Sequence, residues 1–224
     1  MHTGIGQISE VYLDGSARVD CVPELIPAPG QYLLAHANAT DAVLPVPVFL
    51  METARKGFRA APPRHPSLSL GKRLYLRGPL GHGFALPNSA RRVALIALEG
   101  SAARLRGLMD LGLKANSEVV LVSNSTIQDL PEAVEVQPLQ AAKEVCNWAD
   151  FVAFDLGREN LAEWENMLVG WEQFPSVGES QVLIHTSMPC GGLAECGVCA
   201  VTSRHEWKMA CRDGPVFPYA DLFR

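Results

Sequence analysis

The sequence predicts a protein of the α/β plus β class: a small Greek-key β-barrel at residues 1–88, a doubly wound parallel α/β domain at 89–186 and a cysteine-rich tail at 187–224. Three observations lead to this prediction. The first segment contains short β-branched runs separated by glycine and proline; from residue 90 apolar runs alternate with helical patterns; and four of the six cysteines fall within 22 residues near the C-terminus. A chain of 224 residues is long enough for two small cores,.

The barrel is predicted from four apolar runs whose lengths are typical of strands. They are Ile5–Leu13, Gln31–His36, Val46–Met51 and Leu74–Leu76. Turn signals lie between them, among them Asp14-Gly15, Pro29-Gly30 and Pro62-Pro63,. Because no helical periodicity fills the gaps, an antiparallel barrel is favoured over an α/β unit.

The α/β domain is predicted from four continuous apolar runs, which are typical of strands buried on both faces of a parallel sheet. They are Val93–Leu98, Glu118–Val122, Phe151–Phe154 and Gln181–Ile184. Between them, an apolar helical stripe over Leu105–Met109 lies between Ser101, a candidate N-cap, and Gly112,. A second helical stripe runs from Leu161 to Trp171,.

Composition excludes several classes of function. The formal net charge is −5, so the chain lacks the basic surface that a nucleic acid or an anionic membrane would require,. It contains no run of about 18 apolar residues that could span a bilayer,. Its N-terminus also lacks the basic and apolar regions of a secretory signal. We therefore expect a cytoplasmic protein whose cysteines are reduced and available as ligands.

The tail carries the strongest functional signal. Its cysteines have the spacing C-x5-C-x2-C-x11-C and are Cys190, Cys196, Cys199 and Cys211. Three close thiolates and a fourth that returns from a distance are typical of a plant-type [2Fe–2S] cluster, here with one residue added to the first loop. Zinc and disulfides stay open as alternatives, because spacing does not exclude them. Cys21 and Cys146 are expected to be buried apolar residues away from this group.

The residues around these cysteines resemble a known family. Met188-Pro-Cys190 and Cys211-Arg-Asp-Gly-Pro-Val-Phe217 are similar to the C-terminal cluster domain of the electron-transfer subunit of class 1B dihydroorotate dehydrogenase. In that family the last ligand is typically followed by Asp/Glu-Gly-Pro-[IV]-Phe. The resemblance implies a [2Fe–2S] cluster on the four cysteines and a ferredoxin-reductase-like architecture for nearly the whole chain.

Two landmarks in the barrel, Pro29-Gly30-Gln31-Tyr32 and Gly78-Pro-Leu-Gly-His-Gly-Phe84, resemble the flavin domain of the same family. The family binds the FAD pyrophosphate with Arg-Pro-x-Ser, whereas this chain reads Leu44-Pro45-Val46-Pro47 at that place and lacks the arginine,. FAD binding is therefore left open. The residues at which the resemblance places FAD are Pro45, Val46, Pro47, Gly78, Pro79, Leu80 and Gly81.

In the same family the α/β domain binds NAD(H) through a glycine-rich turn that sets a pyrophosphate on a helix N-terminus. The equivalent segment here, Ala97–Arg104, retains one glycine, Gly100, and has Glu99 where the diphosphate would lie. A later segment, Phe154-Asp155-Leu156-Gly157, does not reproduce the family's Cys-Gly-x-Pro motif. We therefore expect a scaffold domain that does not bind NAD.

The sequence favours an electron-transfer subunit without substrate chemistry of its own, since it shows no catalytic constellation. The resemblance implies a partner, the catalytic subunit of a flavoprotein dehydrogenase in a hetero-oligomer, most similar to the dihydroorotate-oxidising subunit of pyrimidine biosynthesis. Two alternatives stay open: a complete NADH-linked FAD/[2Fe–2S] reductase subunit of the hydrogenase or sulfide-reducing kind, and a zinc-stabilised protein-interaction module. The apolar segment Pro215–Arg224 is expected to contact the partner rather than pack internally,.

Overall fold

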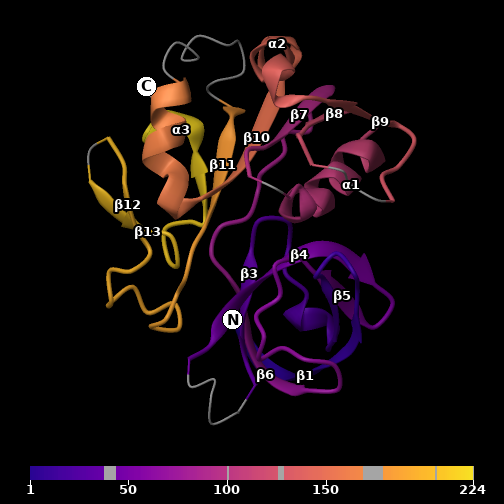
Figure 1. Ribbon diagram of the computed structural model, residues 1–224, viewed down its shortest axis with the longest axis vertical. Coiled ribbons are helices and arrows are strands. Elements are labelled where there is room, and N and C mark those ends of the chain that lie inside the picture. Colours follow the sequence, from indigo (N-terminus) through magenta and orange to yellow (C-terminus); the bar gives the residue numbers. More distant parts are fainter. Residues whose placement is uncertain (38–43, 100, 126–128, 169–178, 205, 224) are drawn as a thin grey trace.

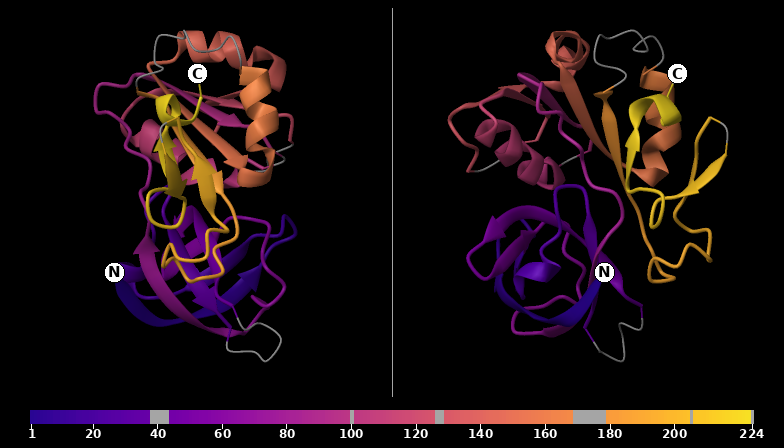
Figure 2. Two further views of the ribbon diagram at one scale, coloured as in Figure 1. Left: turned by 90° about the vertical axis from the view of Figure 1, so that its left-hand side faces the viewer. Right: turned by 180° about the vertical axis from the view of Figure 1, so that it is seen from behind.

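The structure is a computed structural model that describes residues 1–37, 44–99, 101–125, 129–168, 179–204 and 206–223. The barrel and the α/β domain are stacked on one another (Figure 1). The tail runs along one side of the α/β domain, and its cysteine-rich loop descends towards the barrel (Figures 1 and 2). Gly100, Trp171 and His205 lie outside the described residues.

Six antiparallel strands close the N-terminal barrel in the order β1-β2-β5-β4-β3-β6. They are β1 (His2–Val11), β2 (Ala17–Asp20), β3 (Tyr32–His36), β4 (Val46–Ala54), β5 (Gly57–Ala60) and β6 (Arg73–Leu80). A short 3-10 helix, η1 (Pro23–Leu25), adds Leu25 to the barrel core beside Ile8 and Phe58. The predicted barrel is confirmed. Its two unpredicted strands, β2 and β5, have four residues each, too few to show a clear pattern,.

The α/β domain is built on a sheet with the order β14-β11-β10-β7-β8-β9, in which all neighbours are parallel except β14 and β11. Its parallel strands are β7 (Arg92–Ala97), β8 (Glu118–Val122), β9 (Val134–Gln137), β10 (Phe151–Gly157) and β11 (Gln181–His185). The helices are η2 (Ala103–Leu105), α1 (Arg106–Lys114), η3 (Leu139–Ala141), α2 (Ala142–Trp148), η4 (Arg158–Asn160) and α3 (Leu161–Leu168). All seven residues of β10 are buried, as expected for a strand covered on both faces,.

Two separate apolar cores show that helices cover both faces of this sheet. On one face, Leu108 and Met109 of α1 pack with Leu95 of β7. On the other, Val145 of α2 and Trp164 of α3 pack in a cluster with residues of the same sheet. The doubly wound arrangement predicted from the alternating patterns is therefore confirmed.

The tail is joined to the α/β domain rather than standing alone. Its strands are β12 (Ala200–Thr202), β13 (Trp207–Met209) and β14 (Val216–Pro218), followed by α4 (Tyr219–Leu222). β12 and β13 form a hairpin, while β14 extends the α/β sheet by pairing Phe217 with Val182 of β11. Phe217, Tyr219 and Phe223 are at most 2% exposed. The expectation that the terminal segment contacts a partner is therefore wrong for these side chains, because they fill the core of their own chain.

Candidate metal centre

The four cysteines lie on a loop and a hairpin that follow β11. The loop turns tightly, because Gly191, Gly192 and Gly197 have φ values of 67°, 76° and 71°, in the left-handed region that glycine adopts without a steric penalty,. The N–H of Gly191 also donates to the carbonyl of Met188 at 3.1 Å. The chain therefore folds back on itself directly after Cys190.

Backbone N–H groups of this loop point at the Cys190 sulfur. Burial opposes ionisation of the thiol, but hydrogen bonds from the N–H groups of Glu195, Cys196 and Leu193, and from the Cys196 side chain, lower the pKa of Cys190 to about 6,. The thiolate is the form that binds a metal. The glycine-containing loop thus prepares Cys190 to act as a ligand.

The four thiols form two pairs. Cys190 is hydrogen-bonded to Cys196, and Cys199 to Cys211. The hairpin creates the second pair, since Ala210 N–H donates to the carbonyl of Cys199 at 3.0 Å and so brings the next residue back beside it. Burial, followed by the hydrogen bond and charge of Cys199, raises the pKa of Cys211 to about 12, and the charge of Cys190 acts in the same direction. The two pairs are therefore close enough to interact.

This donor set fits a binuclear iron–sulfur cluster better than a single zinc ion. A [2Fe–2S] cluster takes two thiolates on each iron, which matches two pairs. Zinc needs four ligands about 2.0–2.3 Å from one point. Among the described residues, no three His, Cys, Asp or Glu side chains converge closely enough to hold one metal ion. All six cysteines are free thiols, so the four are not joined as disulfides.

The other two cysteines take no part in these hydrogen bonds. Cys146 is fully buried in α2, and burial raises its pKa to about 12. Cys21 packs against the barrel core, where burial and the charge of Asp20 raise its pKa to about 11. Both thiols are therefore protonated near neutral pH, as expected for packing residues.

The loop Gly78–Phe84, which the resemblance assigns to FAD, packs against the tail. A Cβ on Gly81 would lie 2.5 Å from Pro215 Cδ and 2.6 Å from Gly214 O. His82 N–H donates to the same Gly214 carbonyl at 2.6 Å. Because Gly81 has no Cβ, this loop can pack closely against the cysteine-rich tail,.

Of the seven residues expected to bind FAD, Pro45 alone lines either of the two pockets described for this chain. Pro45 lines a groove of about 550 Å³ beside Gly191. The other six residues line neither this groove nor the interdomain pocket described below. The assignment of FAD to these residues therefore stays a prediction.

The crevice where a sheet of this topology holds a dinucleotide is filled by the chain's own side chains. The strand order reverses between β7 and β10, and there Glu99 Oε1 accepts a hydrogen bond from Gly157 N–H at 2.7 Å. Beside it Arg104 Nε donates to both carboxylate oxygens of Asp155 at 3.0 Å, with side chains only 7% and 1% exposed. At this point a pyrophosphate would face the Glu99 carboxylate and an arginine that is already paired, which is a physical reason to expect no NAD here,.

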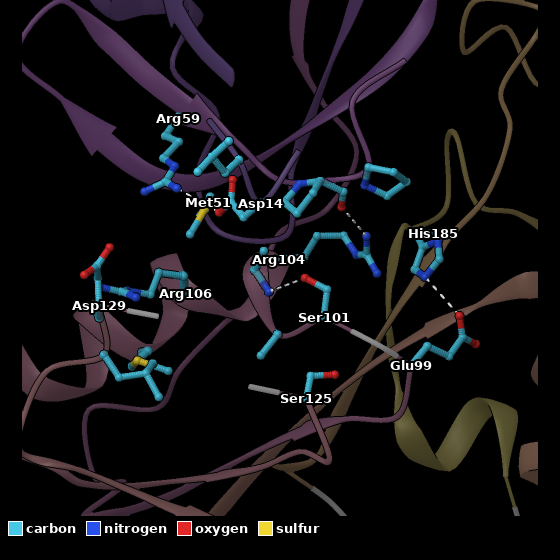
Figure 3. Close-up of a pocket in the computed structure, with 17 residues that line it drawn as sticks. Asp14, Met51, Arg59, Glu99, Ser101, Arg104, Arg106, Ser125, Asp129 and His185 are labelled. Carbon is cyan, nitrogen blue, oxygen red and sulfur yellow. Dashed lines mark hydrogen bonds and ion pairs between the residues drawn. The ribbon is translucent and has the colours of Figure 1, made fainter. Parts of the chain in front are cut away.

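An open pocket of about 690 Å³ lies in front of this crevice, between the barrel and the α/β domain (Figure 3). Of the arginines that line it, Arg59 pairs with Asp14 at 2.8 Å, and Arg106 donates to the backbone carbonyl of Asp129. His185 Nε2 lies 3.5 Å from Glu99 Oε2 without forming a hydrogen bond. Burial, together with the charge of Arg104, lowers the pKa of His185 to about 3, so this side chain is neutral at physiological pH.

Comparisons with known proteins agree with this geometry. Residues 185–223 match the family model of the iron–sulfur cluster binding domain of dihydroorotate dehydrogenase B. A structure of NADH-dependent reduced ferredoxin-NADP oxidoreductase, solved in connection with flavin-based electron bifurcation, superposes with a TM-score of 0.76 at 17% identity, over 98% of this chain and 90% of that one. No match was found among curated proteins.

Two further solved structures share the fold. The ferredoxin reductase in carbazole 1,9a-dioxygenase gives a TM-score of 0.62 at 14% identity, over 82% of this chain and 69% of that one. The Amycolatopsis cytochrome P450 reductase GcoB gives 0.56 at 16% identity, over 80% and 69%. The fold is therefore ferredoxin-reductase-like, and the tail is similar to the iron–sulfur cluster binding domain of dihydroorotate dehydrogenase B.

Sequence reasoning missed the ion pair of Arg104 with Asp155. A signal was present, because Asp155 interrupts an otherwise apolar strand and a buried carboxylate requires a partner,. It also missed that Tyr32 and Arg77 lie beneath the cysteine loop. Tyr32 stood out only as part of the Pro29–Tyr32 landmark of the barrel, and no local pattern marks Arg77, which occupies an ordinary strand position far from the tail in the sequence.

Proposed function

We propose that this chain is the [2Fe–2S] electron-transfer subunit of a flavoprotein dehydrogenase, most similar to the electron transfer subunit of dihydroorotate dehydrogenase. One observation carries the proposal: the segment that matches the cluster-binding domain brings its four cysteines together as two hydrogen-bonded pairs. That is the ligand count and grouping of a [2Fe–2S] centre. The ligands are Cys190, Cys196, Cys199 and Cys211.

The two halves of the site play different parts. Cys199 and Cys211 are 1% and 3% exposed, so they hold their half of the cluster away from water,. Cys196 is exposed, and the loop around Cys190 supplies backbone N–H groups that offset negative charge on sulfur. When bound, a [2Fe–2S] cluster carries one electron at a time. Its exposed half would be the shorter route to a partner.

A partner must supply the substrate chemistry. We infer that this partner is the catalytic subunit of a flavoprotein dehydrogenase, and that the two form a cytoplasmic hetero-oligomer. Apolar surface beside the cysteine loop supports this: Leu193 and Val198 are 58% and 43% exposed, and such groups commonly mark contact sites,. With a dihydroorotate-oxidising partner, the complex would serve pyrimidine biosynthesis. In the described part of the chain no helix is long and apolar enough to cross a membrane.

Cofactor analysis of the anaerobically purified protein tests the proposal. We expect about two irons and two sulfides per chain, a brown colour, and an EPR signal that appears on one-electron reduction. Stoichiometric zinc in place of iron, with a colourless protein, would refute it and establish the zinc-stabilised interaction module instead.

Single substitutions test the ligand assignment. Alanine at any one of the four proposed ligands should abolish the brown colour and the bound sulfide, because a cluster cannot replace a lost thiolate without exposing iron. Cys21→Ala and Cys146→Ala are matched controls that should retain both. Loss of the cluster in Cys146→Ala, with retention in Cys196→Ala, would overturn the assignment.

A complete NADH-linked FAD/[2Fe–2S] reductase subunit is the second candidate. One observation favours it: the interdomain pocket of about 690 Å³ falls within the size range of cofactor sites,. FAD extracted at about one per chain, with reduction of the cluster by NADH, would establish this candidate. Bound iron and sulfide without flavin would instead support the electron-transfer subunit proposed above.

A further inference from the structure

A cation of the barrel, Arg77, lies against the proposed cluster loop. Arg77 is near the end of β6, half-buried, with its Nη2 facing the two glycines that follow Cys190. A Cβ on Gly191 would lie 3.8 Å from this nitrogen, and one on Gly192 would lie 3.5 Å from it. Arg77 and Gly191 also line the same groove. The loop therefore rests directly on a guanidinium group.

Tyr32 fixes the same part of the loop. Its fully buried side chain donates from Oη to the carbonyl of Cys211 at 2.7 Å, and a Cβ on Gly192 would lie 3.0 Å from Oη. Arg77 Nη2 approaches the same glycine, since a Cβ on Gly192 would lie 3.5 Å from it. Tyr32 and Arg77 therefore both lie against the turn of the loop that follows Cys190.

Among the described residues, Arg77 has no acidic partner. None of their ion pairs includes Arg77. No acidic side chain is found among the described residues that line its groove. A half-buried charge is screened less than an exposed one, so this cation acts on whatever negative charge the loop binds.

We propose that Arg77 raises the reduction potential of the cluster by stabilising its reduced form, an inference that rests on the proposed function. Two ferric ions, two sulfides and four thiolates make a doubly negative centre. One electron, from the partner flavin or from dithionite in vitro, reduces one ferric ion to ferrous and makes the centre triply negative. A neighbouring cation stabilises the second state more than the first. Arg77 therefore makes the cluster easier to reduce.

Three variants separate this charge effect from packing. Arg77→Met keeps an unbranched side chain but removes the charge, and should shift the equilibrium about tenfold towards the oxidised cluster, a fall of about 59 mV for a one-electron couple. Arg77→Lys keeps the charge and should restore most of the potential. Arg73→Met is the matched control, because Arg73 is exposed on the same face of β6 about 13 Å along the strand,. It removes the same net charge and should leave the potential unchanged.

An anaerobic redox titration of the intact protein, followed by EPR, measures these potentials after iron and sulfide have been counted. No cluster in the wild-type chain would refute the proposed function itself. A wild-type cluster whose potential is the same in Arg77→Met, or falls equally in Arg73→Met, would overturn the role of Arg77. So would loss of the cluster in both Arg77→Met and Arg77→Gln, since Arg77 would then be needed to hold the loop rather than to set its charge.

Discussion

Tyr219 joins the tail to the core of the α/β domain, and replacing it by alanine tests how the cluster-bearing tail is held. The side chain is fully buried, with its ring centroid 5.2 Å from that of Phe154 on β10 and 5.1 Å from that of Phe223. Its backbone N–H donates to Ser180 O at 2.8 Å, and Tyr219→Ala leaves this hydrogen bond in place. The substitution therefore removes the buried side chain without removing this backbone hydrogen bond.

The expected loss is large relative to the stability of a domain. Truncation of a buried aromatic side chain to alanine costs about 3–5 kcal/mol, because apolar contacts are lost and a cavity remains. Net stabilities are about 5–15 kcal/mol. For a chain of this length each kcal/mol lowers the melting temperature by about 2–4 °C. Tyr219→Ala should therefore lower it by about 6–20 °C.

Thermal and urea unfolding of the cluster-loaded protein, followed by circular dichroism and by cluster absorption, would measure this loss. Trp207→Ala is the control, because Trp207 is an aromatic residue of the same tail that is 68% exposed, and its truncation should change stability by less than about 0.5 kcal/mol,. If Tyr219→Ala unfolded within about 1 kcal/mol of the wild type, the terminal segment would not be part of the internal core. The idea that it serves mainly as a partner contact would then be restored.

Three further predictions concern the interdomain crevice. Calorimetry should detect no micromolar binding of NADH, and micromolar binding would contradict this prediction. The Glu99 carboxylate and a phosphate about 4 Å apart would repel by about 4 kcal/mol at an effective dielectric constant of about 20, which lowers the affinity roughly 1000-fold. Arg104→Met alone should destabilise the protein by about 3–5 kcal/mol in urea unfolding, since it leaves the buried Asp155 carboxylate without its ion-pair partner,. The double variant Arg104→Met with Asp155→Leu should recover most of that loss. Because the folded-state pKa of His185 lies at about 3, below its ordinary value of 6.5, protonation favours unfolding and stability falls as the pH drops below about 6.5,. Between pH 8 and pH 5.5 this residue should account for roughly 1 kcal/mol of loss, and His185→Leu should show a flatter pH dependence; equal slopes would refute the assignment,.

Elements with a strong local pattern could be predicted, and elements without one could not. The run Glu118–Val122 coincides with β8, because a strand buried on both faces is apolar along its whole length,. The predicted helix beginning near Leu105 corresponds to η2 and α1, although α1 continues past Gly112 to Lys114. β9 has only one buried residue and gave no apolar run. Short or half-exposed elements acquire their structure from neighbours rather than from their own sequence.

The candidate site divides in the same way. The four candidate ligands could be chosen from the sequence, since the cysteine spacing lies within 22 residues. The N–H groups aimed at Cys190 were not predicted, because they depend on the left-handed turns of the folded loop, and the pairing of Cys199 with Cys211 depends on the register of β12 with β13. The fate of the terminal segment was predicted wrongly, since an apolar run does not reveal which surface will bury it.

The sequence alone therefore determined which residues can bind metal and where strands and helices form, because ligand chemistry and hydrophobic periodicity are properties of short windows. Only the tertiary structure decided that β14 completes the α/β sheet, that Glu99 and the Arg104 ion pair fill the dinucleotide crevice, and that Arg77 lies beneath the cluster loop. The physical reason is that these features are contacts between distant parts of the chain. Tyr32 and Cys211 are 179 positions apart, and their hydrogen bond forms because two packed domains bring them together.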